Sequence, residues 1–173
     1  NTGQDQWGQV PLFNFRAYGD YPTTINMYLT LPFVKYFGLN PITTRLPTAI
    51  LSFLFIPISY LFVKNKKLGL LIAFLVAISP WTVFTGRAVY QSTVAQTIFF
   101  LGIILLLKST KNKSLLPIAS LIFWLSAFAY HSTKIVVPLI FFSYLLIFKN
   151  QVFTKSNTKN LILSGIISSI LAI

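Results

Sequence analysis

The sequence is 173 residues long, 55% hydrophobic and only 9% charged, with a mean hydropathy of +0.73. A soluble domain carries roughly a quarter charged residues, so this composition excludes a water-exposed globule. It predicts an all-α, multi-span membrane protein. The absence of cysteine excludes disulfides and thiolate metal sites. The net charge of +12 does not predict nucleic-acid binding, because the lysines lie in short loops between apolar runs.

The chain opens with a polar stretch, NTGQDQWGQ, that contains Asp5; the second acid, Asp20, follows in the same region, and no glutamate exists. The first residue is not Met, and the last apolar run, 161–173, is shorter than the ~20 residues that cross a bilayer. We therefore expect a fragment cut from a longer membrane protein at both ends. Residues 1–44 are interpreted as a first outer loop, and residues 45–173 as a transmembrane helical bundle.

Within the front loop, residues Thr23 to Phe37 are apolar, rich in Tyr and Phe, and interrupted by Pro32. Fifteen residues are too few for an ordinary span. Because aromatic residues favour the headgroup level, the stretch predicts a helix lying along the interface. A helix that packs under the loop is an equally good interpretation.

Five apolar runs predict membrane spans: 45–63, 68–86, 89–107, 115–130 and 134–148, followed by a truncated sixth at 161–173. Several of these runs are short and contain proline, which predicts bent or partly submerged helices. The prolines concerned are Pro57, Pro80, Pro117 and Pro138.

The connecting loops differ in charge. Three clusters of three lysines are each separated by two predicted spans, so all three must emerge on one face of the membrane: Lys64, Lys66 and Lys67; Lys108, Lys111 and Lys113; Lys149, Lys155 and Lys159. Lysine accumulates in cytoplasmic loops, which makes this face the inside. The opposite face receives both acids, the only histidine and five basic residues: Arg16, Lys35, Arg45, Arg87 and Lys134.

Asp5 is the first candidate catalytic residue. A lone Asp in a polar loop is usually a cap or turn residue. Here Trp7 follows two positions later, and glycines lie on both sides. A carboxylate beside an aromatic side chain is a suitable general base for a hydroxyl or amine acceptor, because partial desolvation raises the proton affinity of the carboxylate.

The outer cations are candidate phosphate ligands. Arg87 and Lys134 each lie near the start of a predicted span, where such residues commonly extend to lipid headgroups. Together with Arg16 and Arg45, they could instead bind the dianionic phosphate of an isoprenoid lipid and stabilise it as a leaving group.

Other candidates give weaker signals. His131 in Tyr130-His-Ser-Thr-Lys134 is typical of a hydrogen-bonded helix end, although it could donate to a phosphate or a sugar hydroxyl. Gln91 and Gln96 inside a predicted span are typical of helix-packing amides, with Gln91 also a candidate to line a cavity. Metal-ligand spacing is absent, so no cofactor is predicted; a divalent cation stays an open alternative that the ligand spacing does not support.

The order of short motifs resembles a family. Gly19-Asp-Tyr-Pro-Thr-Thr24, Tyr28-Leu-Thr-Leu-Pro32, Phe37-Gly-Leu-Asn40 and Thr44-Arg-Leu-Pro-Thr-Ala49 are similar to the first outer loop and next span of the protein O-mannosyltransferase and aminoarabinose-transferase superfamily. Ile78-Ser-Pro-Trp81 with Arg87-Ala88, and Tyr130-His-Ser-Thr-Lys134 with Pro138, are similar to its later outer turns. These proteins are GT-C integral-membrane glycosyltransferases that use polyprenyl-phosphate sugars.

The resemblance implies a catalytic base at Asp5, which stands where the family has the first acid of an Asp-Glu pair. Gln6 replaces the second acid, Pro-Thr-Thr replaces a frequent Lys-Pro-Pro, and Gln91 stands where an acid is frequent. These departures bear on acceptor and phosphate contacts but leave the base in place. Trp7, Asp20, Tyr21, His131 and Gln91 are the candidate substrate contacts.

The function expected from residues and resemblance together is transfer of a sugar from a polyprenyl-phosphate donor to a lipid, glycan or protein acceptor. The site would lie on the outer face of a cell membrane. The alternatives are a transporter or flippase for a lipid-linked or anionic solute, a non-enzymatic scaffold, and a catalytically silent relative. A transporter would call for ionisable groups within the spans, and the predicted spans have none near mid-depth.

Overall fold

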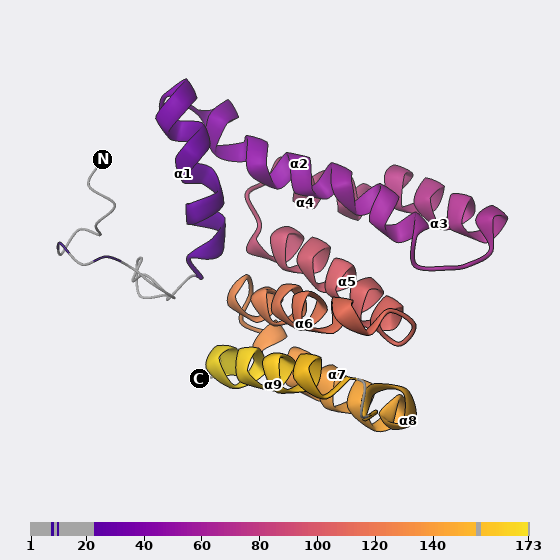
Figure 1. The fold of residues 1–173 in the computed structure, drawn as a ribbon. Helices are drawn as coiled ribbons and strands as arrows, with labels where there is room; N and C mark the ends of the chain where they lie inside the picture. The colour runs from indigo at the N-terminus through magenta and orange to yellow at the C-terminus, as the bar shows by residue number, and fades with distance from the viewer. Residues whose placement is uncertain (1–7, 9, 11–22, 155–156, 173) are drawn as a thin grey trace.

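A computed structural model describes residues 8, 10, 23–154 and 157–172 of the chain (Figure 1). The described part is all-helical, as the composition predicted, and contains no strand. The α-helices are α1 (Ile25–Phe37), α2 (Pro41–Tyr60), α3 (Lys66–Ile78), α4 (Pro80–Arg87), α5 (Gln91–Ser109), α6 (Leu116–Leu125), α7 (Thr133–Ile147), α8 (Lys149–Val152) and α9 (Thr158–Ala172). Two 3₁₀ turns, η1 (Lys113–Leu115) and η2 (Ser126–Phe128), flank α6.

Two helices, α2 and α5, are long and apolar enough to cross a membrane, and they correspond to the predicted spans 45–63 and 89–107. The predicted span 68–86 is divided into α3 and α4, which meet at an angle of 54° and together form a third candidate. The remaining apolar helices are shorter, at 10–17 residues: Lys113–Phe128, Thr133–Ile147 and Thr158–Leu171. The structure thus has two to three helices of spanning length and composition.

The chain reverses direction at residues where the backbone chemistry requires it. Gly38 ends α1 with φ of +76°, in the left-handed region that glycine adopts without strain. Asn40 caps α2, because its Oδ1 accepts a hydrogen bond of 2.8 Å from the Thr43 N–H, and Pro41 begins the helix. The cap places the start of α2 at Pro41, four residues before the expected boundary between the front loop and the bundle.

The break between α3 and α4 follows from Ser79-Pro80. Proline lacks an N–H and disfavours the helical conformation in the residue before it, and Ser79 is extended with ψ of 121°. Pro80 then begins α4 at a position that needs no N–H partner. The bend predicted at Pro80 is confirmed, whereas α2 and α7 continue through Pro57 and Pro138 as single helices.

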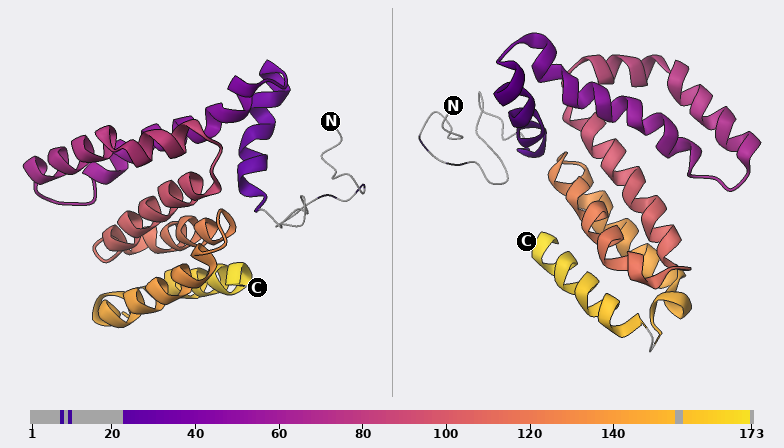
Figure 2. Two further views of the ribbon diagram at one scale, coloured as in Figure 1. Left: turned by 180° about the vertical axis from the view of Figure 1, so that it is seen from behind. Right: turned by 45° about the horizontal axis from the view of Figure 1, so that its top comes forward.

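The helix α1, Ile25–Phe37, confirms a helix within the predicted stretch 23–37, and it continues through Pro32. In two directions of view, α1 lies across the direction that α2, α5, α6, α7 and α9 share (Figures 1 and 2). Its side chains Tyr36 and Phe37 are 79% and 70% exposed, and Asn26 is its one buried residue. The helix packs against α2, to which it is joined by the Thr48–Asn26 hydrogen bond.

The core lies between α5, α6, α7 and α9. Phe123 of α6 is fully buried, and its ring is 5.3 Å from that of Phe99 on α5 and 6.4 Å from that of Phe141 on α7. Gly102 allows α5 and α6 to approach closely, since a Cβ built there would lie 2.6 Å from the Phe123 Cα. Ser120 of α6 and Ser164 of α9 are both buried and joined by a 2.6 Å hydrogen bond. These contacts tie the four helices into one unit.

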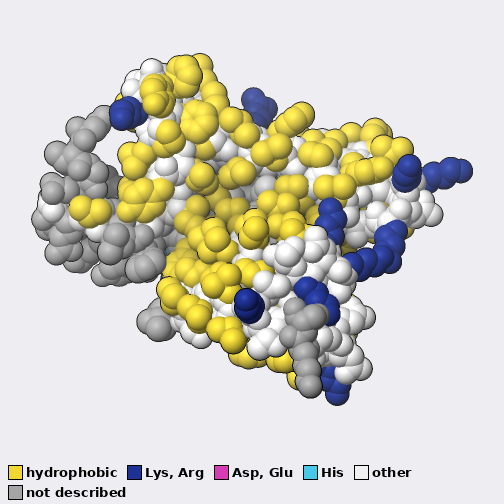
Figure 3. Space-filling model, viewed as in Figure 1, with side chains coloured by type: hydrophobic (Ala, Val, Ile, Leu, Met, Phe, Trp, Pro, Cys, Tyr) yellow, Lys and Arg dark blue, Asp and Glu magenta, His cyan; other side chains and the backbone are white. Residues whose placement is uncertain are grey.

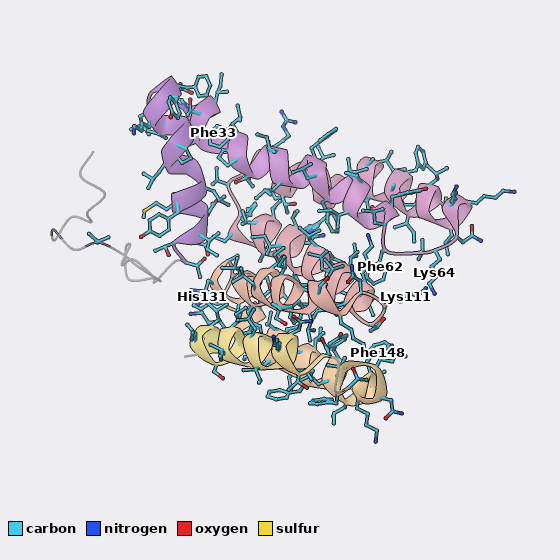
Figure 4. The ribbon with its side chains drawn as sticks, in the orientation of Figure 1. Phe33, Phe62, Lys64, Lys111, His131 and Phe148 are labelled. Carbon is cyan, nitrogen blue, oxygen red and sulfur yellow. The ribbon has the colours of Figure 1, made fainter. Side chains whose placement is uncertain are left out.

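The long helices run back and forth, so their connections gather at two ends (Figure 1). Residues 61–67, 108–113, 148–154 and 157–159 form one of these ends, which we call the lysine end. Lys64 and Lys111 lie there, whereas His131 lies at the other side of the molecule (Figure 4). We call that other part the arginine end; it contains the first two turns of α2, the last turn of α4 and residues 129–134.

Candidate functional site

Five of the ten predicted site residues are described by the structure: Arg45, Arg87, Gln91, His131 and Lys134. The other five, Asp5, Trp7, Arg16, Asp20 and Tyr21, lie outside the described residues. The catalytic assignment of Asp5 therefore stays a prediction. The structure bears on the phosphate ligands instead.

Arg45 and Arg87 line one pocket of about 520 Å³. Arg45 comes from the second turn of α2, and Arg87 is the last residue of α4. Ile56 of α2 and Ala77 of α3 line the same pocket. The structure thus brings together two of the four predicted phosphate ligands, which are 42 positions apart in the sequence.

The rest of the pocket is largely apolar. Leu46, Ala49, Phe53 and Ile56 of α2 face Ala77 and Val83 of the bent pair α3–α4, and Ile42 completes the apolar lining beside Arg45. Ile56 lies 11 residues beyond Arg45, about 16 Å along a helix that rises 1.5 Å per residue. The pocket is a shallow groove with cationic side chains at one end and hydrocarbon along its length. It suits an amphiphilic anion better than a small soluble one.

The floor of the pocket is made by a close approach of α2 and α4. Ser52 donates a 3.1 Å hydrogen bond from Oγ to the Thr82 carbonyl oxygen, and both residues line the pocket. A Cβ built on Gly86 would lie only 2.5 Å from the Ser52 Oγ and 2.7 Å from its Cβ. Only glycine fits at position 86 without a shift, and Arg87 is the next residue. The Ser52–Gly86 contact therefore sets the position of Arg87 relative to Arg45.

Threonine hydroxyls hold the end of α4 and the start of α5 in place. Thr93 donates from Oγ1 to the Thr85 carbonyl oxygen at 3.1 Å, and both threonines are buried. Thr97 donates to the Leu51 carbonyl oxygen of α2 at 3.1 Å. The Thr93 bond satisfies a carbonyl oxygen in the last turn of α4, where the helix offers no further N–H, and the Thr97 bond joins α5 to α2. The last turn of α4, which carries Arg87, is consequently held against α5, and α5 is held against α2.

The end of the front loop lies against residues 129–134, which include His131 and Lys134. Thr23 is 1% exposed, and its Oγ1 donates a 2.8 Å hydrogen bond to the Ala129 carbonyl oxygen. Three residues later, the buried Asn26 accepts a hydrogen bond of 3.3 Å at Oδ1 from the Thr48 hydroxyl of α2. The start of α1 thus contacts both residues 129–134 and the helix that carries Arg45.

Three predicted residues are not brought into the pocket. His131 and Lys134 are exposed; His131 lies in the turn after η2 and Lys134 in the first turn of α7, while Gln91 is half-buried as the first residue of α5. None of them lines the groove between α2 and α4. Among the described residues, no group of three His, Cys, Asp or Glu side chains lies close enough to hold a metal ion.

Sequence reasoning missed the small residues that shape the groove: Ala49, Ser52, Thr82 and Gly86. Ala49 and Ser52 are three positions apart in α2, and Thr82 and Gly86 are four apart in α4, so each pair lies on one helix face. Small residues at this spacing are a signal for close helix packing in membranes, and they could have been found from the sequence.

No family model, curated protein sequence or solved structure matches the chain. The resemblance to the GT-C superfamily accordingly stands on the sequence motifs, and the function has to be argued from the described geometry.

Proposed function

We propose that the protein is an integral membrane protein whose lysine end faces the cytoplasm and whose arginine end faces the opposite compartment. The two to three helices of spanning length support insertion in a membrane. The described lysines of the three clusters lie in or beside the connections at one end of the bundle, and the lysine bias of cytoplasmic segments supports the orientation. The shorter helices α6, α7 and α9 complete the multi-span bundle in this proposal.

Within that frame, the proposed activity is transfer of a sugar from a polyprenyl-phosphate donor to an acceptor at the arginine end. The observation that carries the proposal is the groove that Arg45 and Arg87 line. Its apolar lining extends about 16 Å along α2 from Arg45. Such a groove can receive the phosphate at its cationic end and the first isoprene units along α2. Guanidinium groups form bidentate hydrogen bonds with phosphate oxygens, and both arginines are exposed enough to do so.

The proposed chemistry uses Asp5 as the base. An acceptor oxygen attacks the anomeric carbon of the donor sugar while the bond from that carbon to the phosphate oxygen breaks. The phosphate leaves with the electron pair, and the acceptor proton passes to the Asp5 carboxylate. Arg45 and Arg87 stabilise the charge that develops on the leaving phosphate. Lys134 and His131 are assigned to the sugar or the acceptor, since Thr23 ties the front loop to residues 129–134.

The test measures sugar transfer from a short-chain prenyl-phosphate mannose or aminoarabinose donor by the purified protein. Asp5→Asn should abolish transfer and leave donor binding intact. Arg87→Ala should weaken binding of the same prenyl phosphate on the order of 10-fold, and Arg87→Lys should recover only part of it because lysine lacks the bidentate fork. Transfer at an unchanged rate in Asp5→Asn would exclude the base role.

A donor-binding control keeps the outcomes distinct. Lys35→Gln removes an exposed cation of α1 that does not line the groove, and it should leave prenyl-phosphate binding unchanged. Equal losses in Arg87→Ala and Lys35→Gln would mean that overall charge, and not the groove, attracts the donor.

One observation favours a transporter as the second candidate. A helix broken by more than 40° beside a pocket, as in α3–α4, is a feature of transporter sites. The ionisable residues that line the groove, Arg45 and Arg87, lie at its end and not along its length, which favours chemistry at the membrane border. Reconstitution in liposomes separates the two: flux of a prenyl phosphate or anionic solute without sugar transfer would support the transporter.

A further inference from the structure

Among the described residues, the lysine end carries lysines and no acidic side chain. The sequence has no Asp or Glu after Asp20, so residues 21–173 contain thirteen of the fourteen basic residues and no acidic side chain. Nine of those thirteen are lysines in the three clusters. An ion pair with a side-chain carboxylate could come only from Asp5 or Asp20. The described residues thus offer no side-chain carboxylate to the lysines of this end.

The structure places the eight described lysines of these clusters at one end of the molecule. Residues 108–113 and 148–154 are joined directly, since Lys113 donates from Nζ to the Thr154 hydroxyl at 2.6 Å. The first cluster lies at the same end, as the labelled Lys64 and Lys111 show (Figure 4). In the space-filling view, most of the Lys and Arg side chains gather on this side of the molecule (Figure 3). Lys64, Lys66, Lys67, Lys108, Lys111, Lys149 and Lys159 are all exposed.

The positive potential of this end comes from its lysines and not from helix dipoles. The helices α3, α6 and α9 begin at or near this end, whereas α2, α5 and α7 end there. The partial positive charges of the helix starts are therefore offset by the partial negative charges of the helix ends.

The chemistry beside the lysines identifies the partner. Large apolar side chains adjoin each cluster and are exposed: Phe62 at 44%, Leu68 at 46%, Leu107 at 41%, Ile147 at 73% and Phe153 at 60%. A nucleic acid or an acidic soluble protein would satisfy the lysines but leave these side chains in water. A lipid leaflet with anionic headgroups satisfies both, with acyl chains against the apolar residues and phosphates against the lysines.

We propose that the lysine end binds anionic phospholipid headgroups, and that the protein selects such lipids from a mixed bilayer. The surface is separate from the groove of Arg45 and Arg87, so lipid selection is independent of the proposed sugar transfer. Each lysine near an anionic surface contributes roughly a 5-fold gain in affinity. Removing three should therefore lower the affinity on the order of 100-fold at low ionic strength.

The experiment uses the purified, delipidated protein in a neutral detergent with stepwise addition of phosphatidylglycerol or phosphatidylcholine. Native mass spectrometry counts the lipid molecules retained. The wild type should retain phosphatidylglycerol in preference to phosphatidylcholine, and the preference should fall as salt is raised. The triple change Lys108→Gln, Lys111→Gln and Lys149→Gln should remove most of it.

Two controls keep the result specific. The matched triple change of the same lysines to Arg preserves the charge and should retain phosphatidylglycerol as the wild type does. Lys35→Gln removes one exposed cation of α1, away from the three clusters, and should have less effect than Lys108→Gln alone.

Three results would overturn the proposal. These are unchanged phosphatidylglycerol retention in the triple Gln variant, equal losses in the Gln and Arg triples, and an equal loss in Lys35→Gln. Displacement of phosphatidylglycerol by inorganic polyphosphate or single-stranded RNA at equal phosphate concentration would also overturn it, in favour of a soluble polyanion.

Discussion

The α5–α6 hairpin and the unit of α2, α3 and α4 both depend on glycine contacts between helices, but only the first forms a closed core. Gly102 brings α5 against the Phe123 backbone, and buried aromatic side chains fill the space on both sides. Gly69 likewise lets α3 approach Tyr60 closely, and Gly86 lets α4 approach Ser52. The helix α3 nevertheless has Gly69 as its one buried residue, and α4 leaves a groove. Close backbone approach is thus used once to build a core and once to shape a site.

The largest effect is expected at Gly102. Alanine there would place a Cβ 2.6 Å from the Phe123 Cα, so α5 and α6 would have to move apart. We expect Gly102→Ala to lower the free energy of unfolding by about 2–3 kcal/mol, the scale of overpacking in a filled core. Denaturant unfolding in detergent micelles measures it.

Gly165→Ala is the matched control, because a Cβ there meets nothing within 4 Å. Alanine favours a helix by up to about 1 kcal/mol over glycine, so this change should be neutral or stabilising. Similar destabilisation at both glycines would show that the Gly102 contact does not hold the hairpin together.

The next effect is expected at Gly86, where the clash is with the Ser52 side chain. Gly86→Ala should displace α4, destabilise the protein by about 1–2 kcal/mol, and weaken prenyl-phosphate binding several-fold. Binding of a prenyl phosphate to the purified variant measures the second effect. The double change Gly86→Ala with Ser52→Gly removes both atoms that clash and should recover the binding. Binding that stays at the wild-type level in Gly86→Ala would separate the groove from this contact.

A smaller effect is expected at the serine pair that joins α6 and α9. Ser120 and Ser164 are both buried and bond to each other, so Ser120→Ala leaves the Ser164 hydroxyl without this partner. Interhelical hydrogen bonds in membrane proteins contribute about 0.6–1.7 kcal/mol, and we expect a loss in that range by denaturant unfolding. The double alanine variant should lose less than the sum of the two single changes. Strict additivity would mean that the pair is not coupled.

The smallest effect is expected at Tyr144. Its hydroxyl is 2.8 Å from the Ser109 Oγ, but Ser109 also donates to the Leu106 carbonyl oxygen at 2.7 Å. Tyr144→Phe therefore leaves Ser109 with a partner, and we expect a loss of about 0.5 kcal/mol or less. A loss above that of Ser120→Ala would show that the Tyr144 hydroxyl has a larger role than its bond to Ser109 suggests.

Sequence periodicity and charge predicted most of the helices, because long apolar runs and lysine-bearing loops are local signals. The predicted spans 45–63 and 89–107 match α2 and α5 to within four residues at each end. The predicted span begins at residue 45, whereas α2 begins at Pro41, because Asn40 caps the helix and Pro41 fits its first position. The bend at Pro80 was predicted from proline chemistry, and its 54° angle depends on packing against α2.

The candidate site was predicted less completely. Arg45 and Arg87 were selected for their charge and position, and the structure places both on one groove. The groove itself arises from the contact of Ser52 with Gly86, which depends on the register of α2 against α4. The sequence signals this contact only by the small size of the two residues. Asp5 and the rest of the front loop lie outside the described residues, so their part in the site stays a prediction.

The approach of α5 and α6 at Gly102 also determines the order in which the helices can assemble. Only Thr110 to Asn112 separate α5 from η1, so this hairpin can pack as soon as both helices have left the ribosome. The contact of α6 with α9 waits until a further 44 residues, from Ser120 to Ser164, have been synthesised. Cysteine crosslinking in nascent chains should accordingly detect the first contact in a chain that ends before α9 and the second only in longer chains.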